Sequence, residues 1–548
     1  MHSIFAQLER HGDRTCLVEG DRRWTYAEAA ATADGLFADA DLPRRGLAFL
    51  QAHMTAAAIL AYIGAVRRGY AVHLLDPAKT EATARLIARY RPDVVIDTAS
   101  EQSLHVAGTG QGIHEDIAIL LSTSGSTGTP KLVKLSHANI AANTGAIISY
   151  LGLGGADIGI TSLKLFYSYG MSVVNTHLAA GAGLVVTDLG MDSPGFWALA
   201  RREGVTNVAG VPFSFELLHR AGFDPGAVPT LRLLTQAGGR LAPDLVRAFA
   251  QSGAPHGVDF CVMYGQTEAA PRMSWLPPDL AAEAPGSIGQ AIPGGRLSLV
   301  DEAGRPITEP GTSGELVYEG PNVMVGYAES REDLAFTEVI PALRTGDIAH
   351  FDARGLFYID GRTSRFVKPY GIRVSLDDIE QSLRRSFPEV AVTGTDDRIV
   401  VSIGAPVAER EALVARLSAE LALPPAVFVI VENRAVPRLA SGKIDYKALL
   451  AAHAAPDAPP SLPRVFLREF VGILTGRARK PASVLEAYRA VLGPRVRDRT
   501  VTFRKAGGDS LSYMQVLLLL EECLREVPEG WDEMTVMQLE HLREAAFV

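Results

Sequence analysis

Hydrophobic positions change their spacing repeatedly along residues 1–450 of the chain. Residues 25–40 and 55–69 carry the three-to-four-residue spacing of helices, whereas residues 47–52 and 70–76 are short apolar runs that indicate buried strands. This alternation predicts an α/β fold whose mostly parallel sheet is covered on both faces. Because 548 residues exceed what one hydrophobic core holds, we expect about two to four folding units.

A stretch of small polar residues, LSTSGSTGTPK, interrupts the alternation at residues 121–131. Residues 116–121 indicate a buried strand and residues 137–151 a helix, so the expected order is strand, loop, helix. The glycines let backbone N–H groups turn toward one point, the hydroxyls add donors, and Lys131 adds a positive charge. These features favour a loop that grips a polyphosphate over the alternative, a flexible Ser/Gly linker. The lysine follows Pro130 rather than a glycine, so the loop differs from the GxxxxGK[ST] pattern.

The order of residues in this loop resembles the phosphate loop of the enzymes that form acyl- and aminoacyl-adenylates. That superfamily includes acyl-CoA ligases, luciferases and the adenylation domains of nonribosomal peptide synthetases. The resemblance implies that ATP is the nucleotide, and that an α/β large adenylating domain is followed by a small α+β subdomain. The loop residues expected to contact ATP are Ser122, Thr123, Ser124, Gly125, Ser126, Thr127, Gly128 and Lys131.

Two later segments supply further groups for a nucleotide. A strand-like segment runs into Gly238 and Gly239, where a turn without side chains lets a flat base approach the backbone. Tyr264 offers a ring that can stack on adenine, Thr267 offers a hydroxyl to a phosphate, and Glu268 offers a hard oxygen ligand to the Mg²⁺ that accompanies ATP. The run Tyr-Gly-Gln-Thr-Glu also matches the YGxTE motif of the adenylate-forming enzymes, which places Thr267 and Glu268 among the expected catalytic residues.

Two more segments follow the pattern of the same superfamily. Residues 313–327 resemble its GEL…G…GY segment, to which we assign a scaffolding role and no chemistry. Asp347, in the motif TGD, is placed by the resemblance to accept hydrogen bonds from both ribose hydroxyls, as a carboxylate can. Arg362, in a Gly-Arg pair, is the expected second contact to the ribose or to a phosphate.

Residues 362–450 resemble the small subdomain and carry the remaining expected catalytic residues. Ser364 falls at the hinge position, which usually carries Asp or Lys in the family; a small polar residue can still absorb a domain rotation there. Lys368 matches a lysine that faces the active site only in the second, thioester-forming orientation. Lys443, in a PxxxxGKxDxxxL frame, matches the catalytic lysine of adenylation. Ser375 is the expected cap of the first helix, with acids in its first turn.

The acid pocket of the superfamily is formed in part by an aromatic turn, which corresponds here to Tyr167, Ser168 and Gly170. Peptide synthetase domains usually place an Asp in this turn to hold the substrate's α-ammonium group, but neither Tyr167 nor Ser168 is anionic. Because burying an ammonium without a counter-charge is expensive, we expect a small acyl, hydroxy or aryl acid, with a β- or ω-amino acid still open. Met263 and Arg272 complete the expected pocket, although pairing with a structural acid is the favoured role of Arg272.

The C-terminal part of the chain has a different composition. Residues 451–463 are rich in Ala and Pro and predict a linker, and residues 464–548 are mostly helical by pattern. Residues 507–511, GGDSL, resemble the phosphopantetheine attachment motif of carrier proteins, with Ser510 as the modified residue. A serine that opens a helix suits an arriving phosphodiester, while the alternative is a plain helix cap after a glycine turn. We therefore expect an all-α carrier domain of the four-helix type.

Charge and cysteine content narrow the class of protein further. The formal net charge of -9 argues against a nucleic-acid partner bound through a basic face. Cys16, Cys261 and Cys523 have no metal or disulfide spacing, which favours a reducing compartment. No apolar run reaches the ~18 residues of a membrane span, and the N-terminus lacks a signal-peptide pattern, so a cytoplasmic protein without a membrane span is expected.

These motifs predict a ligase that uses ATP and Mg²⁺ to activate a small carboxylic acid as an acyl-adenylate. The acyl group then passes to a 4′-phosphopantetheine thiol, attached to Ser510 by a phosphopantetheinyl transferase, and is held for a downstream acyl-accepting or transferase enzyme. One alternative is a stand-alone acyl-CoA ligase with a structural tail. Another is a non-catalytic acyl-binding or regulatory protein, against which the presence of Lys131, Glu268 and Lys443 argues. The expected parts are a large adenylating subdomain (1–361), a small subdomain (362–450), a linker (451–463) and a carrier domain (464–548).

Overall fold

The chain forms two compact units in the computed structural model, Met1–Thr363 and Ser364–Val548. The division falls beside Ser364, the expected hinge position. The residues that the structure describes are 3–38, 42–43, 45–98, 103–106, 112–122, 131–362, 365–367, 369, 374–395, 398–407, 409–421, 423–432, 435–438, 444–452, 483–492, 496, 499–503, 505–506, 516, 519–520, 523–524, 527–528 and 531–545.

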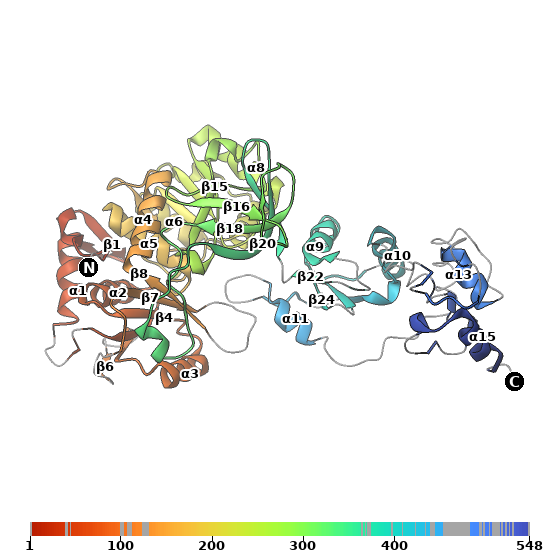
Figure 1. The fold of residues 1–548 in the computed structure, drawn as a ribbon. Helices are drawn as coiled ribbons and strands as arrows, with labels where there is room; N and C mark the ends of the chain where they lie inside the picture. The colour runs from red at the N-terminus through yellow and green to blue at the C-terminus, as the bar shows by residue number, and fades with distance from the viewer. Residues whose placement is uncertain are drawn as a thin grey trace. The chain divides into compact units, whose positions relative to one another are not determined.

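A seven-stranded sheet contains the first strands that the sequence predicts (Figure 1). Its strands, in order across the sheet, are β19 (Tyr327–Ala328), β8 (Leu132–Ser136), β7 (Ile117–Ser122), β4 (Ala71–Leu75), β3 (Leu47–Gln51), β5 (Val94–Asp97) and β6 (Ser103–Val106). The four strands β7, β4, β3 and β5 pair in parallel, and antiparallel strands flank them on both sides. Every residue of β4 is buried, as expected for a strand covered on both faces.

A larger sheet of fourteen strands forms the other half of the large unit. From β13 to β1 its strands pair in parallel, and the remaining pairs are antiparallel. In order across the sheet the strands are β17 (Pro306–Ile307), β16 (Arg296–Val300), β18 (Gly314–Glu319), β20 (Leu343–Phe351), β21 (Phe357–Arg362), β15 (Ser287–Ala291), β14 (Arg272–Leu276), β13 (Asp259–Gly265), β12 (Leu233–Gln236), β11 (Asn207–Gly210), β9 (Ile158–Ile160), β10 (Gly183–Val185), β1 (Thr15–Glu19) and β2 (Arg22–Thr25).

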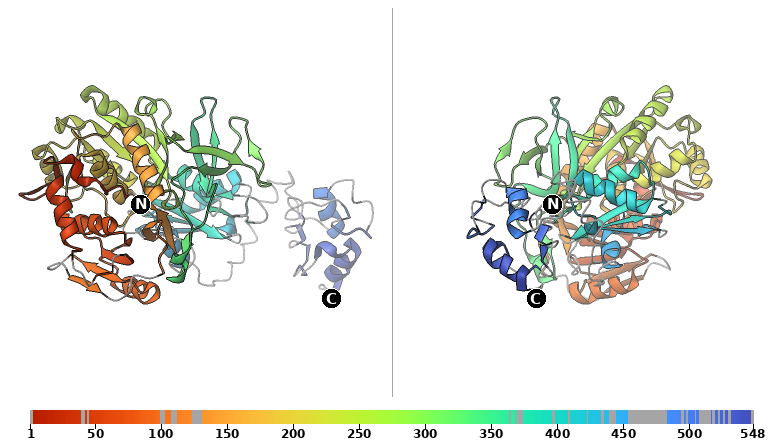
Figure 2. Two further views of the ribbon diagram at one scale, coloured as in Figure 1. Left: turned by 60° about the vertical axis from the view of Figure 1, so that its left-hand side comes forward. Right: turned by 90° about the vertical axis from the view of Figure 1, so that its right-hand side faces the viewer.

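Helices cover the sheets in layers, which Figure 2 shows from two further sides. The largest hydrophobic core joins α1, α2, α4 and α5 to inward-facing side chains of both sheets, so these helices lie between them. A second core packs α6, α7 and α8 on the opposite face of the larger sheet, and a third packs α3 on the seven-stranded sheet. The helices are α1 (Tyr26–Gly35), α2 (Ala56–Arg68), α3 (Thr80–Tyr90), α4 (His137–Leu151), α5 (Ser168–Ala180), α6 (Pro194–Arg202), α7 (Pro212–Arg220) and α8 (Pro243–Gly253), with short 3-10 turns η1 (Leu8–His11), η2 (Pro225–Ala227), η3 (Ala254–His256), η4 (Thr267–Ala269), η5 (Pro278–Leu280) and η6 (Glu332–Ala335).

Local sequence signals explain where the first helices begin and end. Thr25 and Glu28 form a capping box at the start of α1. Thr55 caps the start of α2, and Gly69, with φ of 93°, is its C-cap. The predicted helix at residues 25–40 ends earlier than expected, at Gly35, because glycine is a poor helix former.

The phosphate loop is followed by a strand, not directly by a helix as the sequence pattern predicted. Strand β8 runs antiparallel to β7, so residues 123–130 connect two paired strands. Helix α4 begins after β8, and its N-terminus is closed by a capping box between Ser136 and Asn139. The run Leu132–Ser136 is too short for its period to show in the sequence, which is why the pattern missed it.

The first part of the second unit has the α+β composition expected of the small subdomain. The predicted cap is confirmed: the Ser375 hydroxyl accepts a hydrogen bond from the Asp378 N–H at 3.2 Å. A continuous apolar core joins α9 and α10 to the three-stranded sheet of β24, β25 and β26. The elements are β22 (Phe366–Val367), β23 (Val374–Ser375), α9 (Leu376–Arg384), β24 (Val390–Thr395), β25 (Arg398–Ile403), α10 (Arg410–Leu421), η9 (Pro425–Val427), β26 (Phe428–Glu432) and α11 (Tyr446–Ala452).

A buried carboxylate, that of Glu380, organises this subdomain. It accepts hydrogen bonds from Arg365 at 3.2 Å, from Arg384 at 2.8 Å and from the Tyr446 hydroxyl at 2.9 Å. The guanidinium of Arg365 also lies over the Tyr446 ring, 3.8 Å from its centroid, and pairs with Asp377 at 2.6 Å. Glu380 therefore ties the segment that follows the expected hinge to the start of α11.

The C-terminal described residues form a separate hydrophobic cluster around Tyr488, Phe503 and Trp531. The described elements are helical: α13 (Val484–Leu492), η11 (Trp531–Glu533) and α15 (Val536–Ala545). Residues 507–515, which include Ser510, lie outside the described residues, so the all-α carrier domain stays a prediction. Within the part of the chain that the structure describes, no helix has both the length and the apolar content to cross a membrane.

We expect Glu380→Ala to lower the stability of the small subdomain by about 3 kcal/mol, because it leaves the buried Arg365 without one of its counter-charges. Hydrogen exchange of peptides from α9 and β24 measures this local effect, since a chain with several folding units does not unfold in one step. Arg384→Ala is the matched control: its side chain is 43% exposed, and we expect a loss of about 0.5 kcal/mol. Equal protection in both variants would contradict the central role of Glu380.

Candidate active site

The two described ends of the phosphate loop lie side by side. Ser122 closes β7 and pairs with Leu132 at the start of β8, and Lys131 directly precedes that strand. Residues 123–130, which include Thr123, Ser124, Gly125, Ser126, Thr127 and Gly128, lie outside the described residues. The hairpin therefore fixes where the loop begins and ends, at the edge of the central strands.

Lys131 and Glu268, two of the predicted ATP-site residues, are brought together by Tyr327. The Tyr327 hydroxyl donates a hydrogen bond to Glu268 Oε1 at 3.0 Å, and Lys131 Nζ lies 5.8 Å from the centroid of the same ring. Lys131 Nζ also pairs with Glu329 Oε1 at 2.9 Å. Burial and the Glu268 carboxylate both raise the pKa of Tyr327, so this hydroxyl stays a donor at neutral pH. The segment that we treated as scaffolding thus contributes a residue to the site.

The position of Tyr327 is set by buried polar contacts behind it. Strand β19 pairs with β8, and Lys134, on β8, donates from Nζ to the Phe336 carbonyl at 2.9 Å. Arg331 makes a bidentate pair with Asp93 at 3.0 and 2.9 Å, where the Asp93 side chain is 1% exposed. These contacts hold residues 327–336 against the seven-stranded sheet, beside Lys131.

A second group of predicted residues surrounds the carboxylate of Asp347, which is 2% exposed. Arg362 pairs with Asp347 Oδ1 at 2.8 Å, across the β20–β21 register. The Tyr264 hydroxyl and Gln266 Nε2 both donate to Oδ2, the latter at 3.2 Å. Burial, followed by the Asp347 charge, raises the pKa of Tyr264 well above its ordinary value. Gln266, for which the sequence predicted no role, is thus one of the hydrogen-bond donors to Asp347.

The Gly238-Gly239 turn follows β12, as predicted. Gly238 has φ of 88°, a left-handed conformation that favours glycine, and the Gly239 carbonyl accepts a hydrogen bond from Gln236 Nε2 at 2.9 Å. The turn therefore presents backbone rather than side chains beyond the end of β12.

The aromatic turn joins the start of α5 to the YGxTE segment. Tyr167 is the residue before α5, Ser168 is its first residue, and the Thr267 hydroxyl lies 3.4 Å from Ser168 Oγ. A side chain at Gly170 would lie 2.1 Å from the Lys164 carbonyl oxygen. Gly170 therefore serves close packing of the turn, while Ser168 and Thr267 share one face of the site.

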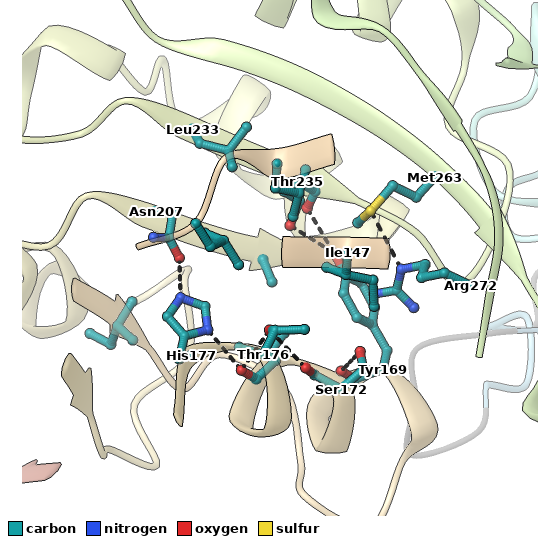
Figure 3. Close-up of a pocket in the computed structure, with 15 residues that line it drawn as sticks. Ile147, Tyr169, Ser172, Thr176, His177, Asn207, Leu233, Thr235, Met263 and Arg272 are labelled. Carbon is teal, nitrogen blue, oxygen red and sulfur yellow. Dashed lines mark hydrogen bonds between the residues drawn. The ribbon is translucent and has the colours of Figure 1, made fainter. Parts of the chain in front are cut away.

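A small cavity of about 20 Å³ lies behind this turn (Figure 3). Tyr169 and His177 reach it from α5, and Met263 and Arg272 reach it from β13 and β14. Met263 and Arg272 are two of the residues predicted to form the pocket. The remaining lining residues are Ile147, Leu151, Leu153, Ile160, Ser172, Val173, Thr176, Asn207, Ala209, Leu233 and Thr235.

His177 has a structural role at this cavity. Its Nδ1 lies 2.7 Å from the Val173 carbonyl and its Nε2 lies 2.6 Å from Asn207 Oδ1. Burial lowers the pKa of His177, and a neutral imidazole has a single N–H, so the neutral ring donates to one of these two oxygen atoms. Lys368, Lys443, Ser364 and Ser510, by contrast, lie outside the described residues, and their roles stay predictions.

Comparison with known proteins identifies the class to which this architecture belongs. The family model described as AMP-binding enzyme matches residues 100–328. Over 352 residues the chain is 30% identical to indoleacetate–CoA ligase of Aromatoleum aromaticum, covering 61% of this chain and 67% of that protein. Over 278 residues it is 33% identical to an L-proline–[L-prolyl-carrier protein] ligase of Streptomyces coelicolor, covering 49% and 52%.

The fold matches solved members of the same class. O-succinylbenzoate Coenzyme A synthetase (MenE) from Bacillus subtilis, in complex with ATP and a magnesium ion, superposes with a TM-score of 0.66 at 22% identity, covering 82% of this chain and 99% of that one. The chain therefore belongs to the AMP-binding enzymes, the adenylate-forming family. It is an ATP-dependent ligase of the acid–thiol class.

The residues of the site fit a magnesium ion held chiefly by its nucleotide. Among the described residues, no group of three or more His, Cys, Asp or Glu side chains could hold a metal ion. Glu268 offers one carboxylate, and Mg²⁺ is commonly bound by one or two carboxylates together with phosphate oxygens and water. A single carboxylate beside a phosphate loop therefore suits Mg²⁺ better than a metal that needs an all-protein cage.

We expect Tyr327→Phe to raise the Mg²⁺ concentration for half-maximal ATP–pyrophosphate exchange about 10-fold, since a hydrogen bond to a charged group contributes about 1.5 kcal/mol. The measurement is a Mg²⁺ titration at fixed ATP. Tyr358→Phe is the matched control, because its hydroxyl donates to Asp352 at 3.3 Å and belongs to no part of the site. An unchanged Mg²⁺ dependence in Tyr327→Phe would show that this hydroxyl does not position Glu268.

Proposed function

We propose that this protein activates a small carboxylic acid as an acyl-adenylate and transfers it to a phosphopantetheine thiol on its own C-terminal domain. The observation that carries the proposal is the contact of Tyr327 with both Lys131 and Glu268. It unites the cation that ends the phosphate loop with the predicted magnesium ligand, although the two are far apart in the chain.

In the first half-reaction an oxygen of the substrate carboxylate attacks the α-phosphorus of ATP, and the bond to pyrophosphate breaks. Lys131 and the hydroxyls of residues 122–127 hold the leaving phosphates, Thr267 donates to a phosphate, and Glu268 binds Mg²⁺, which neutralises phosphate charge. Lys443 stabilises the charge that develops between the carboxylate and the α-phosphate.

The nucleoside would be held at the opposite group of residues. The Tyr264 ring and the Gly238-Gly239 turn form the adenine site, and Asp347 accepts hydrogen bonds from the ribose hydroxyls. Arg362 pairs with Asp347 and has a side chain that is 59% exposed, so it can exchange this partner for the ribose or a phosphate. Tyr264 and Gln266 keep the carboxylate oriented during that exchange.

In the second half-reaction the thiol attacks the acyl carbon and AMP leaves. Rotation of the small subdomain about Ser364 would withdraw Lys443 and bring in Lys368. The GGDSL motif with Ser510 and the helical C-terminal elements support a carrier as acceptor, as does the likeness to a ligase whose name specifies a carrier protein. Free CoA is the second candidate acceptor, favoured by the likeness to indoleacetate–CoA ligase.

The acid itself is unlike the usual substrate of a peptide synthetase domain. Ser168, or Tyr167 in the adjacent register, stands where peptide synthetase domains usually place an Asp, and the described residues that line the cavity include no Asp or Glu. An α-ammonium group would find no counter-charge there, so the proposed substrate is a small acyl, hydroxy or aryl acid. The small volume of the cavity and the charge of Arg272 in its lining limit the choice of acid further.

Intact-protein mass spectrometry tests the acceptor. We expect incubation with a phosphopantetheinyl transferase and CoA to add one phosphopantetheine to the whole chain, and ATP, Mg²⁺ and a pool of acids to add an acyl increment. Ser510→Ala should abolish both mass gains while ATP–pyrophosphate exchange continues. If no phosphopantetheine is added and free acyl-CoA accumulates, the carrier proposal is wrong and the protein is a CoA ligase.

The two lysines separate the half-reactions. We expect Lys443→Ala to reduce ATP–pyrophosphate exchange about 100-fold or more, the usual effect of losing one group that stabilises developing charge. Lys368→Ala should keep the exchange activity and lose thioester formation, so each variant controls for the other. Exchange activity that survives in Lys443→Ala would remove this lysine from the adenylation step.

A further inference from the structure

Arg272 is a buried cation at the cavity behind the aromatic turn. The residue is 3% exposed, and its guanidinium lies over the Tyr169 ring, 4.0 Å from the centroid. Its Nε contacts Met263 Sδ at 3.4 Å (Figure 3). These neighbours are neutral, so the contacts orient the guanidinium without neutralising it.

The sequence favoured a structural acid as the partner of Arg272, and the structure describes none. Among the described residues no Asp or Glu forms an ion pair with Arg272, and none lines the cavity. Two other arginines have such partners: Arg331, with a side chain 14% exposed, pairs with Asp93 at 2.9 Å, and the buried Arg365 pairs with Glu380 at 3.2 Å. A guanidinium buried without a carboxylate is costly, and such groups concentrate at functional sites.

The backbone of Arg272 is anchored independently of its side chain. Two buried amides fix it: Asn143 Nδ2 donates to the Arg272 carbonyl at 2.9 Å, and Asn322 Nδ2 donates to the same oxygen at 2.8 Å. Both asparagines are 1% exposed. Because β14 is held in this way, the chain does not need the guanidinium to keep the strand in place.

The cavity beside Arg272 accepts only a small group. Its volume of about 20 Å³ is only slightly larger than the roughly 10–15 Å³ that one water molecule requires. The hydroxyls of Ser172 and Thr176 that line it already donate to the Tyr169 and Ser172 carbonyls, at 2.7 and 2.8 Å. Arg272 is therefore the lining group whose charge would bind an anionic end. A short chain that ends in a compact anion suits this space, whereas an aryl ring or a long alkyl chain does not.

The cavity also adjoins the proposed reaction centre. Tyr169 follows Ser168, whose hydroxyl lies 3.4 Å from that of Thr267, so a substrate activated beside Thr267 would direct its far end toward Tyr169 and Arg272. We propose, on the basis of the proposed adenylation, that the substrate is a short dicarboxylic acid. Arg272 binds the carboxylate that does not react, through the bidentate geometry that guanidinium and carboxylate share.

The test compares isosteric substrates that differ in one charge. ATP–pyrophosphate exchange by the full chain is measured with malonate, succinate and glutarate as substrates, and each diacid is compared with its own mono-amide. We expect at least one diacid to exceed its mono-amide about 100-fold or more in kcat/KM, because loss of the anion leaves the buried cation unpaired. A mono-amide, a monocarboxylic acid or a β-amino acid that is activated better than every diacid would overturn the inference.

A substitution at Arg272 gives the second readout. Arg272→Met keeps the length of the side chain and removes its charge, and we expect it to abolish the preference for diacid over mono-amide. Arg296→Met is the matched control, because that arginine lies on the exposed strand β16 and pairs with Glu319 at the surface. An Arg272→Met variant that keeps the diacid preference would overturn the inference.

The same panel distinguishes failure of the inference from failure of the proposed function. If a monocarboxylic acid drives exchange and the diacids do not, the protein is an adenylate-forming ligase and only the role of Arg272 is wrong. If no acid in the panel or in a broad acid pool drives exchange, the proposed function itself fails. If the Arg272→Met variant does not fold, the comparison of diacid with mono-amide in the wild-type protein is the deciding measurement.

Discussion

The antiparallel pairing of β8 with β19 is the contact on which the rest of the site depends. Tyr327 pairs with Val133, and Val133 lies two residues after Lys131 in the chain. This register places the Tyr327 ring beside Lys131 and lets the Tyr327 hydroxyl donate to Glu268. The two strands are far apart in the chain, so the fold must close a long loop before either residue meets the other. The contacts of Lys134 with the Phe336 carbonyl and of Arg331 with Asp93 stabilise this pairing from behind the site.

The charges of the site are organised before any substrate arrives. Asp347 is almost fully buried, yet its carboxylate is oriented by Arg362, Tyr264 and Gln266, so its desolvation is offset by fixed donors. Arg272 presents the opposite case, since its contacts orient the guanidinium but supply no negative charge. The first arrangement holds an acceptor ready for hydroxyl donors, and the second holds a donor ready for an anion. The two ends of a substrate adenylate would therefore meet complementary groups.

Much of the fold could be predicted from the sequence, because the signals that define its helices and strands are local. The strands around β3 and β4, the helix α2 and the Ser375 cap depend on spacing and capping within a few residues, and they are confirmed. The role of Tyr327 could not be predicted, since it follows from strand pairing between distant segments. The same applies to Arg272: its motif places it near the pocket, but only the packed structure reveals that its neighbours include no described acid. Strand β8 was missed for a different reason, because five residues between a glycine-rich loop and a helix show no clear period.

The second unit adds a mechanical constraint to the proposed two-step reaction. Arg365 directly follows the expected hinge at Ser364, and Tyr446 follows Lys443 by three residues; both contact the buried carboxylate of Glu380. Ile444, next to Lys443, is bridged to Arg438, and the Asp445 N–H donates to the Pro437 carbonyl at 2.8 Å. The described residues on either side of the Lys443 position are thus paired with each other, and Tyr446 contacts the same carboxylate as the segment after the hinge. In the proposed rotation about Ser364, these flanking residues would move together with the segment after the hinge.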